Sequence, residues 1–336
     1  MRILLSRTDS IGDVVLTLPM AGMIKKHLPE SEIHFLGRSY TSPVVACSGH
    51  VDHFHNFDDI EKMRDADAAE VIKSWGIDVW IHVFPVKKIA RLVKQADVKT
   101  RIGTTGRLYH ILTCNKLVRI SRKRSDLHES QLNLKLLAPL GITENTRLDD
   151  MPSLISFNKV PELSERITSL LNPGKFNIIL HPKSKGSAIE WGLENFSALM
   201  NKLEKDDFQV IVTGTEEDKK AIGSSLPLDN KNVVNLLGKL SLEELIALIS
   251  FSDALVAAST GPLHLAGILD RLAIGLFSSR RPIHPGRWAP IGKYSHALEN
   301  FDDCQNCAEG EGCYCISAIS PMTVIRMIEA HRSRSA

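Results

Sequence analysis

The chain contains 336 residues, a length that favours two domains of about 100–200 residues each and excludes a small disulfide-stapled module. Hydrophobic residues make up 43% and charged residues 24% of the chain, which is typical of a folded globular protein and excludes a disordered or coiled-coil chain. The net charge of +2 excludes a generic nucleic-acid-binding protein, although a balanced sum can hide a locally charged segment.

Short apolar runs alternate with amphipathic stretches from the first residues onward. This alternation is typical of repeated strand-helix-strand units with parallel strands, so the predicted fold class is α/β. The elements predicted in the first half are a strand at Arg2–Ser6, a helix at Asp13–Leu28, strands at Ile33–Leu36 and Asp78–Phe84, and a helix at Asp126–Leu140. A strand-poor stretch with three prolines, residues 141–174, is the predicted linker.

The second half repeats this architecture. Its predicted strands are Phe176–Leu180, Phe208–Thr213, Val233–Leu236, Ala254–Val256 and Leu272–Phe277. Its predicted helices are Leu193–Lys205, one beginning at Glu216, Leu242–Ile249, one beginning at Pro262, and a last one from Pro321 to about Arg332. We therefore predict two doubly wound, Rossmann-like domains, 1–165 and 176–320, that face a central cleft, with the helix of 321–336 returning to the N-terminal domain.

No stretch reaches the 18 apolar residues of a membrane span, and Arg7 and Asp9 interrupt the short apolar run at the start. We therefore expect no signal peptide and no membrane anchor. Four of the six cysteines crowd into twelve residues, which is unlike a secreted disulfide scaffold. These features predict a cytoplasmic protein.

The loop after the first predicted strand, residues 7–13, reads RTDSIGD. Gly12 permits a tight turn at the start of a helix, and the loop matches neither a dinucleotide fingerprint nor a Walker loop. Asp9 and Asp13 supply two carboxylates, one of which could take a proton from an acceptor hydroxyl. The alternative is that both only cap the helix, where acidic residues are favoured.

Two loops of the second half offer groups suited to a nucleotide. Lys183, Ser184 and Lys185 follow the first strand, and lysines in such a loop suit phosphate oxygens, although a solvated loop has the same composition. Glu216 and Glu217 follow the next strand and could accept hydrogen bonds from ribose hydroxyls, or serve as acids of a first helical turn.

A third loop, Ser259, Thr260 and Gly261 followed by Pro262, opens a helix directly after a strand. Its backbone N–H groups and the positive helix end could hold a diphosphate, with His264 one turn inside the helix. Read alone, the same residues are an ordinary helix cap with proline in the first turn.

The segment 87–124 contains twelve basic residues and one acidic residue, a formal charge of +11, and the rest of the chain carries −9. One interpretation is a solvated charged face. The other is recognition of an anionic acceptor and of the lipid surface that carries it.

Cys304, Cys307, Cys313 and Cys315 have the ligand count of a zinc or iron site, but the last pair is closer together than in common zinc motifs. They are either free or structural thiols, with an occasional disulfide, or a structural metal site.

Four segments in this order resemble glycosyltransferase family 9, the ADP-heptose:lipopolysaccharide heptosyltransferases. The segments are RTDSIGDVVLTLP at 7–19, LGKLSLEEL at 237–245, STGPLHLA at 259–266 and RWAPIG at 287–292. The resemblance spans nearly the whole chain. It implies a GT-B fold, in which the N-terminal domain holds the acceptor and the C-terminal domain holds the nucleotide-sugar.

The resemblance implies an inverting transferase that moves a heptose from ADP-heptose to a hydroxyl of a lipopolysaccharide core. Asp13 matches the family's proposed general base. The implied donor-binding residues are Lys183, Ser184, Lys185, Glu216, Glu217, Leu240, Ser259, Thr260, Gly261 and His264. The expected acceptor-binding residues are Asp9, Gly12, Arg101, Arg107 and Arg119.

No required cofactor and no catalytic metal are expected. The expected partners are the nucleotide-sugar, an anionic glycolipid acceptor and the inner face of the cytoplasmic membrane, where the protein would be peripheral, with no nucleic acid. Ser259 and Ile189 depart from the family pattern, which commonly has Asp and Lys at these places. The alternatives are therefore a transferase with another nucleotide-sugar or a non-lipid acceptor, or a catalytically idle nucleotide- or glycan-binding module.

Overall fold

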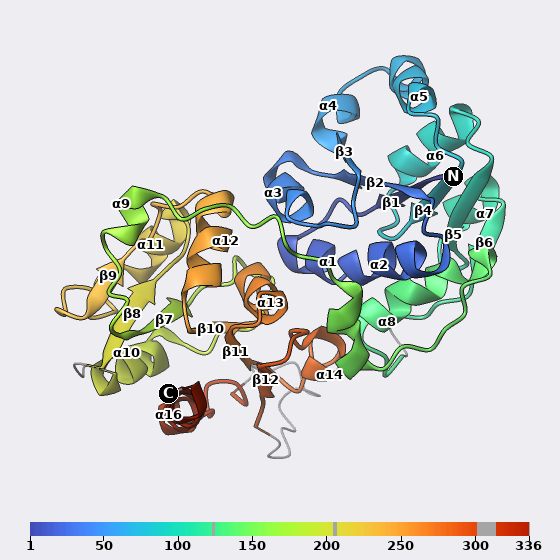
Figure 1. The fold of residues 1–336 in the computed structure, drawn as a ribbon. Helices are drawn as coiled ribbons and strands as arrows, with labels where there is room; N and C mark the ends of the chain where they lie inside the picture. Colours follow the sequence, from blue (N-terminus) through green and yellow to red (C-terminus); the bar gives the residue numbers. More distant parts are fainter. Residues whose placement is uncertain (123–124, 204–206, 301–313, 336) are drawn as a thin grey trace. The chain divides into compact units, whose positions relative to one another are not determined.

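The computed structural model describes residues 1–122, 125–203, 207–300 and 314–335, and divides into two compact units, Met1–Lys159 and Val160–Ala336 (Figure 1). The boundary between them falls six residues before the predicted end of the first domain. No helix among the described residues is long and apolar enough to cross a membrane.

Unit 1 is a parallel six-stranded sheet in the order β3-β2-β1-β4-β5-β6. Its strands are β1 (Arg2–Ser6), β2 (Glu32–Gly37), β3 (His53–Asn56), β4 (Val79–His82), β5 (Thr100–Thr104) and β6 (Lys116–Val118). Its helices are α1 (Ile11–Val15), α2 (Leu18–His27), η1 (Ser39–Thr41), α3 (Ser42–Ala46), α4 (Phe57–Glu61), α5 (Asp65–Ser74), α6 (Lys87–Gln95), α7 (Leu108–Thr113), α8 (Glu129–Leu134), η2 (Lys135–Leu140) and η3 (Leu148–Leu154). Since both faces of a parallel sheet are covered, its central strands are continuously apolar, as β1 is at Ile3, Leu4 and Leu5.

Unit 2 repeats this plan in the order β12-β11-β10-β7-β8-β9, again with every pair parallel. Its strands are β7 (Phe176–His181), β8 (Phe208–Val212), β9 (Val233–Asn235), β10 (Ala254–Ala258), β11 (Leu272–Leu276) and β12 (Ser295–Leu298). Its helices are α9 (Glu165–Thr168), α10 (Leu193–Lys202), α11 (Glu216–Ile222), α12 (Leu242–Phe251), α13 (Gly261–Ile268), α14 (Pro285–Trp288) and α16 (Pro321–Ser335). The α/β class of two doubly wound sheets is therefore confirmed.

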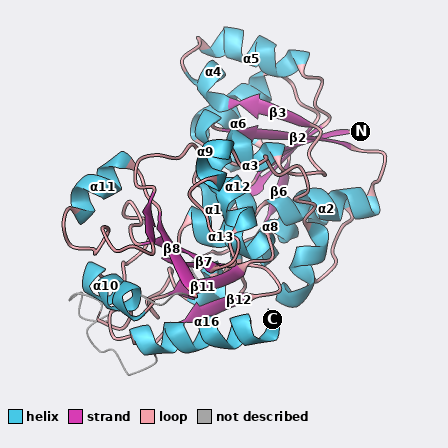
Figure 2. Ribbon diagram, turned by 60° about the vertical axis from the view of Figure 1, so that its left-hand side comes forward, coloured by secondary structure: helices cyan, strands magenta, loops and turns pink. Residues whose placement is uncertain are grey.

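The last helix, α16, is a member of unit 2. It packs against α10 and β11, and Val324, Ile325 and Ile328 lie in the same apolar core as Trp191 (Figure 2). The indole N–H of Trp191 donates to the carbonyl of Ile319, 2.9 Å away, which fixes the entry to this helix. These contacts differ from the expectation that the helix returns to the N-terminal domain, because its apolar face is buried within unit 2.

Two helices predicted as continuous are divided. The stretch predicted as Asp13–Leu28 is α1 and α2 with a break at Leu16 and Thr17, since Pro19 lies in the first turn of α2. The stretch predicted as Asp126–Leu140 begins at Glu129 and tightens into the 3₁₀ helix η2, which contains Pro139.

Candidate active site

The loop with the predicted catalytic carboxylate lies at the carboxyl end of β1. Chain order reverses between β1 and its neighbour β4, so this is the switch point of the first sheet, where doubly wound folds bind ligands. The backbone N–H of Arg7 donates to Leu36 and that of Phe84 donates to Ser6, which ties the ends of β1, β2 and β4 together.

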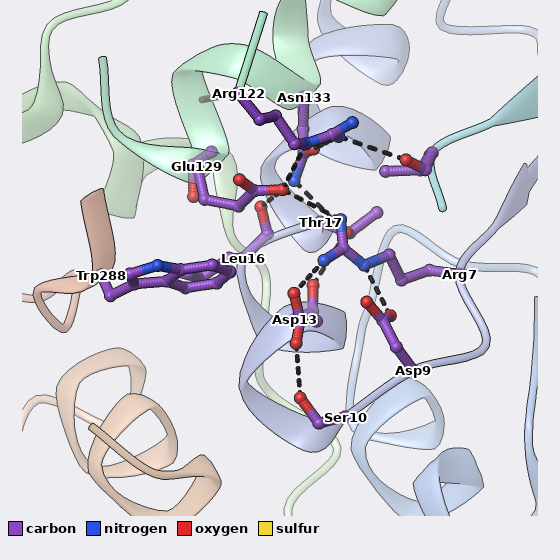
Figure 3. A network of polar contacts seen from close by, with 12 residues as sticks. Arg7, Asp9, Ser10, Asp13, Leu16, Thr17, Arg122, Glu129, Asn133 and Trp288 are labelled. Carbon is purple, nitrogen blue, oxygen red and sulfur yellow. Dashed lines mark hydrogen bonds and ion pairs between the residues drawn. The ribbon is translucent and has the colours of Figure 1, made fainter. Parts of the chain in front are cut away.

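A buried arginine organises this loop. The guanidinium of Arg7, whose side chain is 3% exposed, contacts three carboxylates: Asp9 at 2.7 Å, Glu129 at 3.2 Å, and Asp13 (Figure 3). The guanidinium also lies over the ring of Phe84, 5.8 Å from its centroid. One cation therefore holds acidic groups from β1's loop, from α1 and from α8 at one place.

Glu129 is a buried member of this network that sequence reasoning missed. Its side chain is 1% exposed, and it accepts from Arg122 at 2.9 Å as well as from Arg7. Arg122 also donates to Asn133, 3.0 Å away, and Asn133 donates to the carbonyl of Leu16 between α1 and α2 (Figure 3). Arg7 stood in the recognisable motif, but nothing in the sequence linked it to Glu129, 122 residues away.

The contacts of Asp13 favour the catalytic interpretation over simple capping. Its carboxylate binds the Arg7 guanidinium and the Ser10 hydroxyl, both of which are side-chain groups (Figure 3). Its carbonyl accepts from Thr17 at 2.8 Å, which fixes the turn. Ser10 occupies the N-cap position without a side-chain capping bond.

Asp9 lies on the other side of Arg7. Burial raises the pKa of its carboxyl, and the Arg7 guanidinium opposes this shift. The carbonyl of Asp9 accepts from the hydroxyl of Tyr40. Asp9 thus serves to position Arg7, and Gly12 is buried in the turn between the two acidic residues.

Unit 2 has its own switch point, between β7 and β10. The loop after β10 ends at Thr260, which is the N-cap of α13. Thr260 is 6% exposed. Its hydroxyl oxygen has no hydrogen-bond partner among the residues that the structure describes. A buried hydroxyl without a partner, beside the first N–H groups of an eight-residue helix, suits a ligand anion.

The predicted donor residues lie on the adjacent strand ends. Ser259 and Gly261 flank Thr260, and His264 is 3% exposed within α13. Lys183 pairs with Glu190, whose other oxygen accepts from the backbone N–H and the hydroxyl of Ser184 at 2.9 and 3.1 Å. Lys183 is therefore engaged within its own loop.

Lys185 differs from Lys183, because it is exposed and has a left-handed backbone, φ +50°. A hydrogen bond at the backbone of Glu217 and another from the Thr215 side chain lower the pKa of Glu217. The charges of Lys185 and Lys220 lower this pKa further. The loops after β7 and β8 lie close together because the two strands pair in parallel. Of the two lysines, Lys185 is the one that its loop presents to solvent.

Glu216 adjoins the loop after β9. Gly238 has φ +70°, and a side chain there would overlap the carboxylate of Glu216. The N–H of Gly238 donates to Gly214 at 2.9 Å, which brings Leu240 to the same edge of the sheet. The structure thus places Glu216 beside Gly238, two residues before Leu240 in the chain.

The three arginines expected to bind the acceptor have different surroundings. Arg101 donates to the backbone carbonyls of Thr113 and Val98, so it stabilises the β5–α7 connection. Arg107, the N-cap of α7, and Arg119 are exposed. Only the latter two have the exposure that an acceptor contact requires.

The predicted cysteine cluster is only partly visible. Cys304, Cys307 and Cys313 lie outside the described residues, and Cys315 is 5% exposed.

Comparisons with known proteins agree with this geometry. A model of glycosyltransferase family 9 (heptosyltransferase) matches residues 77–314. A provisionally assigned glycosyltransferase of Haemophilus influenzae is 26% identical over 86% of both chains, and an Escherichia coli lipopolysaccharide heptosyltransferase 3 is 22% identical over 83% of this chain and 84% of its own. The structure of E. coli ADP-heptose lps heptosyltransferase II aligns over 100% of both chains with a TM-score of 0.77 and 17% identity.

Two doubly wound units of this topology have the GT-B fold, and the match to the family model makes the chain a glycosyltransferase. The resemblance inferred from the four motifs is confirmed. The chain belongs to glycosyltransferase family 9, the heptosyltransferase family.

Proposed function

We propose that this enzyme transfers a heptose from ADP-heptose to a hydroxyl of a lipopolysaccharide core, with inversion at the anomeric carbon. The donor and acceptor are those of two similar E. coli proteins, the ADP-heptose lps heptosyltransferase II and the lipopolysaccharide heptosyltransferase 3. The single observation that carries the catalytic assignment is the ion pair between Asp13 and the buried Arg7 at the switch point of unit 1.

In the proposed reaction, the acceptor oxygen forms a bond to the anomeric carbon as the bond from that carbon to the diphosphate oxygen breaks. Asp13 accepts the acceptor's proton, and ADP leaves with the bonding electron pair. Arg7 holds the Asp13 carboxylate in place, and Glu129 holds Arg7. Asp9 completes the set of groups that fix the guanidinium.

The leaving diphosphate gains negative charge as this bond breaks. The hydroxyl of Thr260, the first N–H groups of α13 and the Lys185 ammonium are the groups that would stabilise this charge. Glu216 and Glu217 would accept from the ribose hydroxyls, and Leu240 would contact the adenine. No step in this scheme requires a metal ion.

The test is the substitution Asp13→Asn. Turnover should fall about 10²–10⁴-fold, since the amide cannot accept the proton, while ADP affinity should change little. Asp67→Asn, an exposed carboxylate paired with Arg64, is the matched control and should keep full activity. Normal turnover of Asp13→Asn would remove Asp13 from this role and direct attention to Asp9.

A different nucleotide-sugar is the second candidate, and the observation that favours it is Ile189. This residue packs against the apolar core of unit 2, where the family commonly has a lysine. A thermal-shift panel of nucleoside diphosphates and nucleotide-sugars identifies the donor. If a nucleotide raises the melting temperature but no donor is turned over, the binding-module alternative is favoured instead.

The acceptor is lipid-linked in this proposal, and α7 offers a surface for the membrane that carries it. Leu108, Ile111 and Leu112 on this helix are 75%, 53% and 67% exposed, and Leu117 nearby is 39% exposed. We define these four residues as the α7 surface. Basic residues precede and follow the α7 surface in the sequence. A hollow beside Leu112 is also lined by Lys87, Arg91 and Lys94.

Exposed apolar side chains bordered by cations match an anionic bilayer, because the apolar groups enter the lipid boundary as the cations pair with headgroups. Co-sedimentation with phosphatidylglycerol-containing vesicles tests this. Leu108→Ser with Leu112→Ser should weaken binding about tenfold or more, and high salt should also weaken it. Leu170→Ser, an exposed leucine of unit 2, is the control. Equal binding of both variants, or equal binding to neutral vesicles, would contradict the proposal.

A further inference from the structure

A histidine-rich cluster lies on the two outer strands β3 and β2, away from the loops that carry the proposed reaction. Glu32 and His34 are alternate residues of β2, so their side chains point to the same face. His53 of β3 lies opposite His34 in the parallel register. Glu32 and His53 are the first residues of their strands, whereas Asp13 follows the carboxyl end of β1.

The three side chains converge on a small volume. Glu32 Oε1 lies 2.6 Å from His53 Nε2 and 3.5 Å from His34 Nε2, and one ligand atom from each of the three lies within 4.8 Å of the others. Two imidazoles and one carboxylate form a ligand set that zinc prefers, with a water in the fourth position.

His34 provides the second observation. It is 5% exposed, and its Nε2 makes no hydrogen bond with any residue that the structure describes, although it faces Glu32. A buried ring nitrogen without a partner is costly unless something else binds it. A metal ion bound to its lone pair would remove that cost.

The surroundings of His34 prepare it for this role. Its Nδ1 lies 2.8 Å from Nε2 of His55, and His55 stacks on Trp75 with 3.9 Å between ring centroids. Such an outer hydrogen bond fixes the orientation and tautomer of a metal-binding imidazole.

Arg2 binds one carboxylate oxygen of Glu32, and the other oxygen faces the histidines. Glu32 Oε2 accepts from Arg2 Nε at 2.9 Å, which leaves Oε1 directed at the two histidines. The Arg2 guanidinium reduces the negative charge available to a cation, so a transition metal bound through nitrogen is favoured over Ca²⁺ or Mg²⁺. His53 is 52% exposed, so it can shift from its hydrogen bond with Glu32 to a metal ion.

We propose that His34 Nε2, His53 Nε2 and Glu32 Oε1 bind a divalent transition-metal ion, Zn²⁺ being the physiological candidate. The ion joins β3, an edge strand of four residues, to β2. It stabilises unit 1 and takes no part in glycosyl transfer.

The test compares the wild-type full chain with the variant His53→Ala. This substitution removes the exposed ligand His53 and keeps the buried imidazole of His34. His27→Ala, a half-exposed histidine beside Glu144, is the matched control. Protein stripped with EDTA is dialysed against Zn²⁺, and bound metal is counted. His53→Ala should bind one equivalent fewer than the other two proteins. Zn²⁺ should raise the melting temperature of the wild type and of His27→Ala by about 4 °C or more, and that of His53→Ala by clearly less.

Co²⁺ distinguishes this site from the cysteine cluster. A site of nitrogen and oxygen ligands gives weak visible bands without thiolate-to-cobalt charge transfer, and only those bands should disappear in His53→Ala. Unchanged stoichiometry in His53→Ala, or cobalt bands of thiolate character alone, would overturn the proposal. Transfer activity should be equal in all three proteins, so this outcome is separate from the test of Asp13.

Discussion

At the scale of single residues, the decisive feature is that one arginine contacts three carboxylates. Arg7 lies among Asp9, Asp13 and Glu129, and Arg122 supplies a second cation to Glu129. Breaking a buried ion pair by removing one partner costs more than the pair itself contributes, because the remaining charges stay in a poorly solvated place.

Arg7→Met should therefore destabilise unit 1 by about 3–5 kcal/mol at neutral pH. The loss should be smaller near pH 5, because protonation of the carboxyls removes their mutual repulsion. Urea unfolding at both pH values measures this. Arg64→Met, whose parent side chain is 85% exposed, should cost less than about 1 kcal/mol. Equal stability of the two variants would show that the cluster does not depend on Arg7.

The residue scale also shows where sequence reasoning ended. Asp13, Thr260 and Lys185 follow strands directly, so the rule that ligands bind at strand carboxyl ends located them. Glu129 lies on a helix, far along the chain, and only the folded sheet brings it to Arg7. Lys183 and Arg101 match the expected residue type, but local carboxylate and carbonyl partners occupy them.

At the scale of elements, the inner strands other than β5 and the edge strand β9 were predicted to within two residues, whereas β5 and the edge strands β3, β6 and β12 were not predicted. β7 and β8 each contain a run of three buried apolar residues, Ile178–Leu180 and Val210–Val212, which is a strong signal. β3 reads HFHN, and β6 is largely exposed, so neither has the apolar pattern of a strand. Their place comes from pairing with a neighbour, which a single sequence does not reveal.

The helix α16 gives a prediction at this scale. Ile328 is fully buried in the core of unit 2, so Ile328→Ala should lower its unfolding free energy by about 2–5 kcal/mol. Met322→Ala, on the exposed side near the start of the same helix, should change it by less than about 0.5 kcal/mol. Chemical denaturation of both variants provides the measurement. An undiminished stability of Ile328→Ala would mean that α16 packs more loosely than described.

At the scale of the whole molecule, the chain divides its chemistry between two units. The groups suited to a diphosphate belong to unit 2, and the carboxylate cluster belongs to unit 1. ADP at about 100 times its dissociation constant should therefore add about 2.7 kcal/mol to the stability of unit 2.

Hydrogen exchange with and without ADP checks this division. Exchange should slow in the loops after β7, β8 and β10, and should change little in the loop at 7–13. Thr260→Ala should weaken the protection, since it removes the buried hydroxyl. Protection confined to unit 1 would contradict the assignment of the donor site.

The connection between the units has a consequence of its own. η3 lies against α2 so closely that a side chain at Gly22 would overlap the carbonyl of Leu154, and Lys159 donates to Cys47 at 3.2 Å. Arg166 already pairs with Glu244 of unit 2 at 2.7 Å. The tether is thus residues 160–163, which extend to about 14 Å at most. So short a tether keeps the two units at a mutual effective concentration of roughly millimolar or more, so any encounter between them is an intramolecular event that dilution of the protein leaves unchanged.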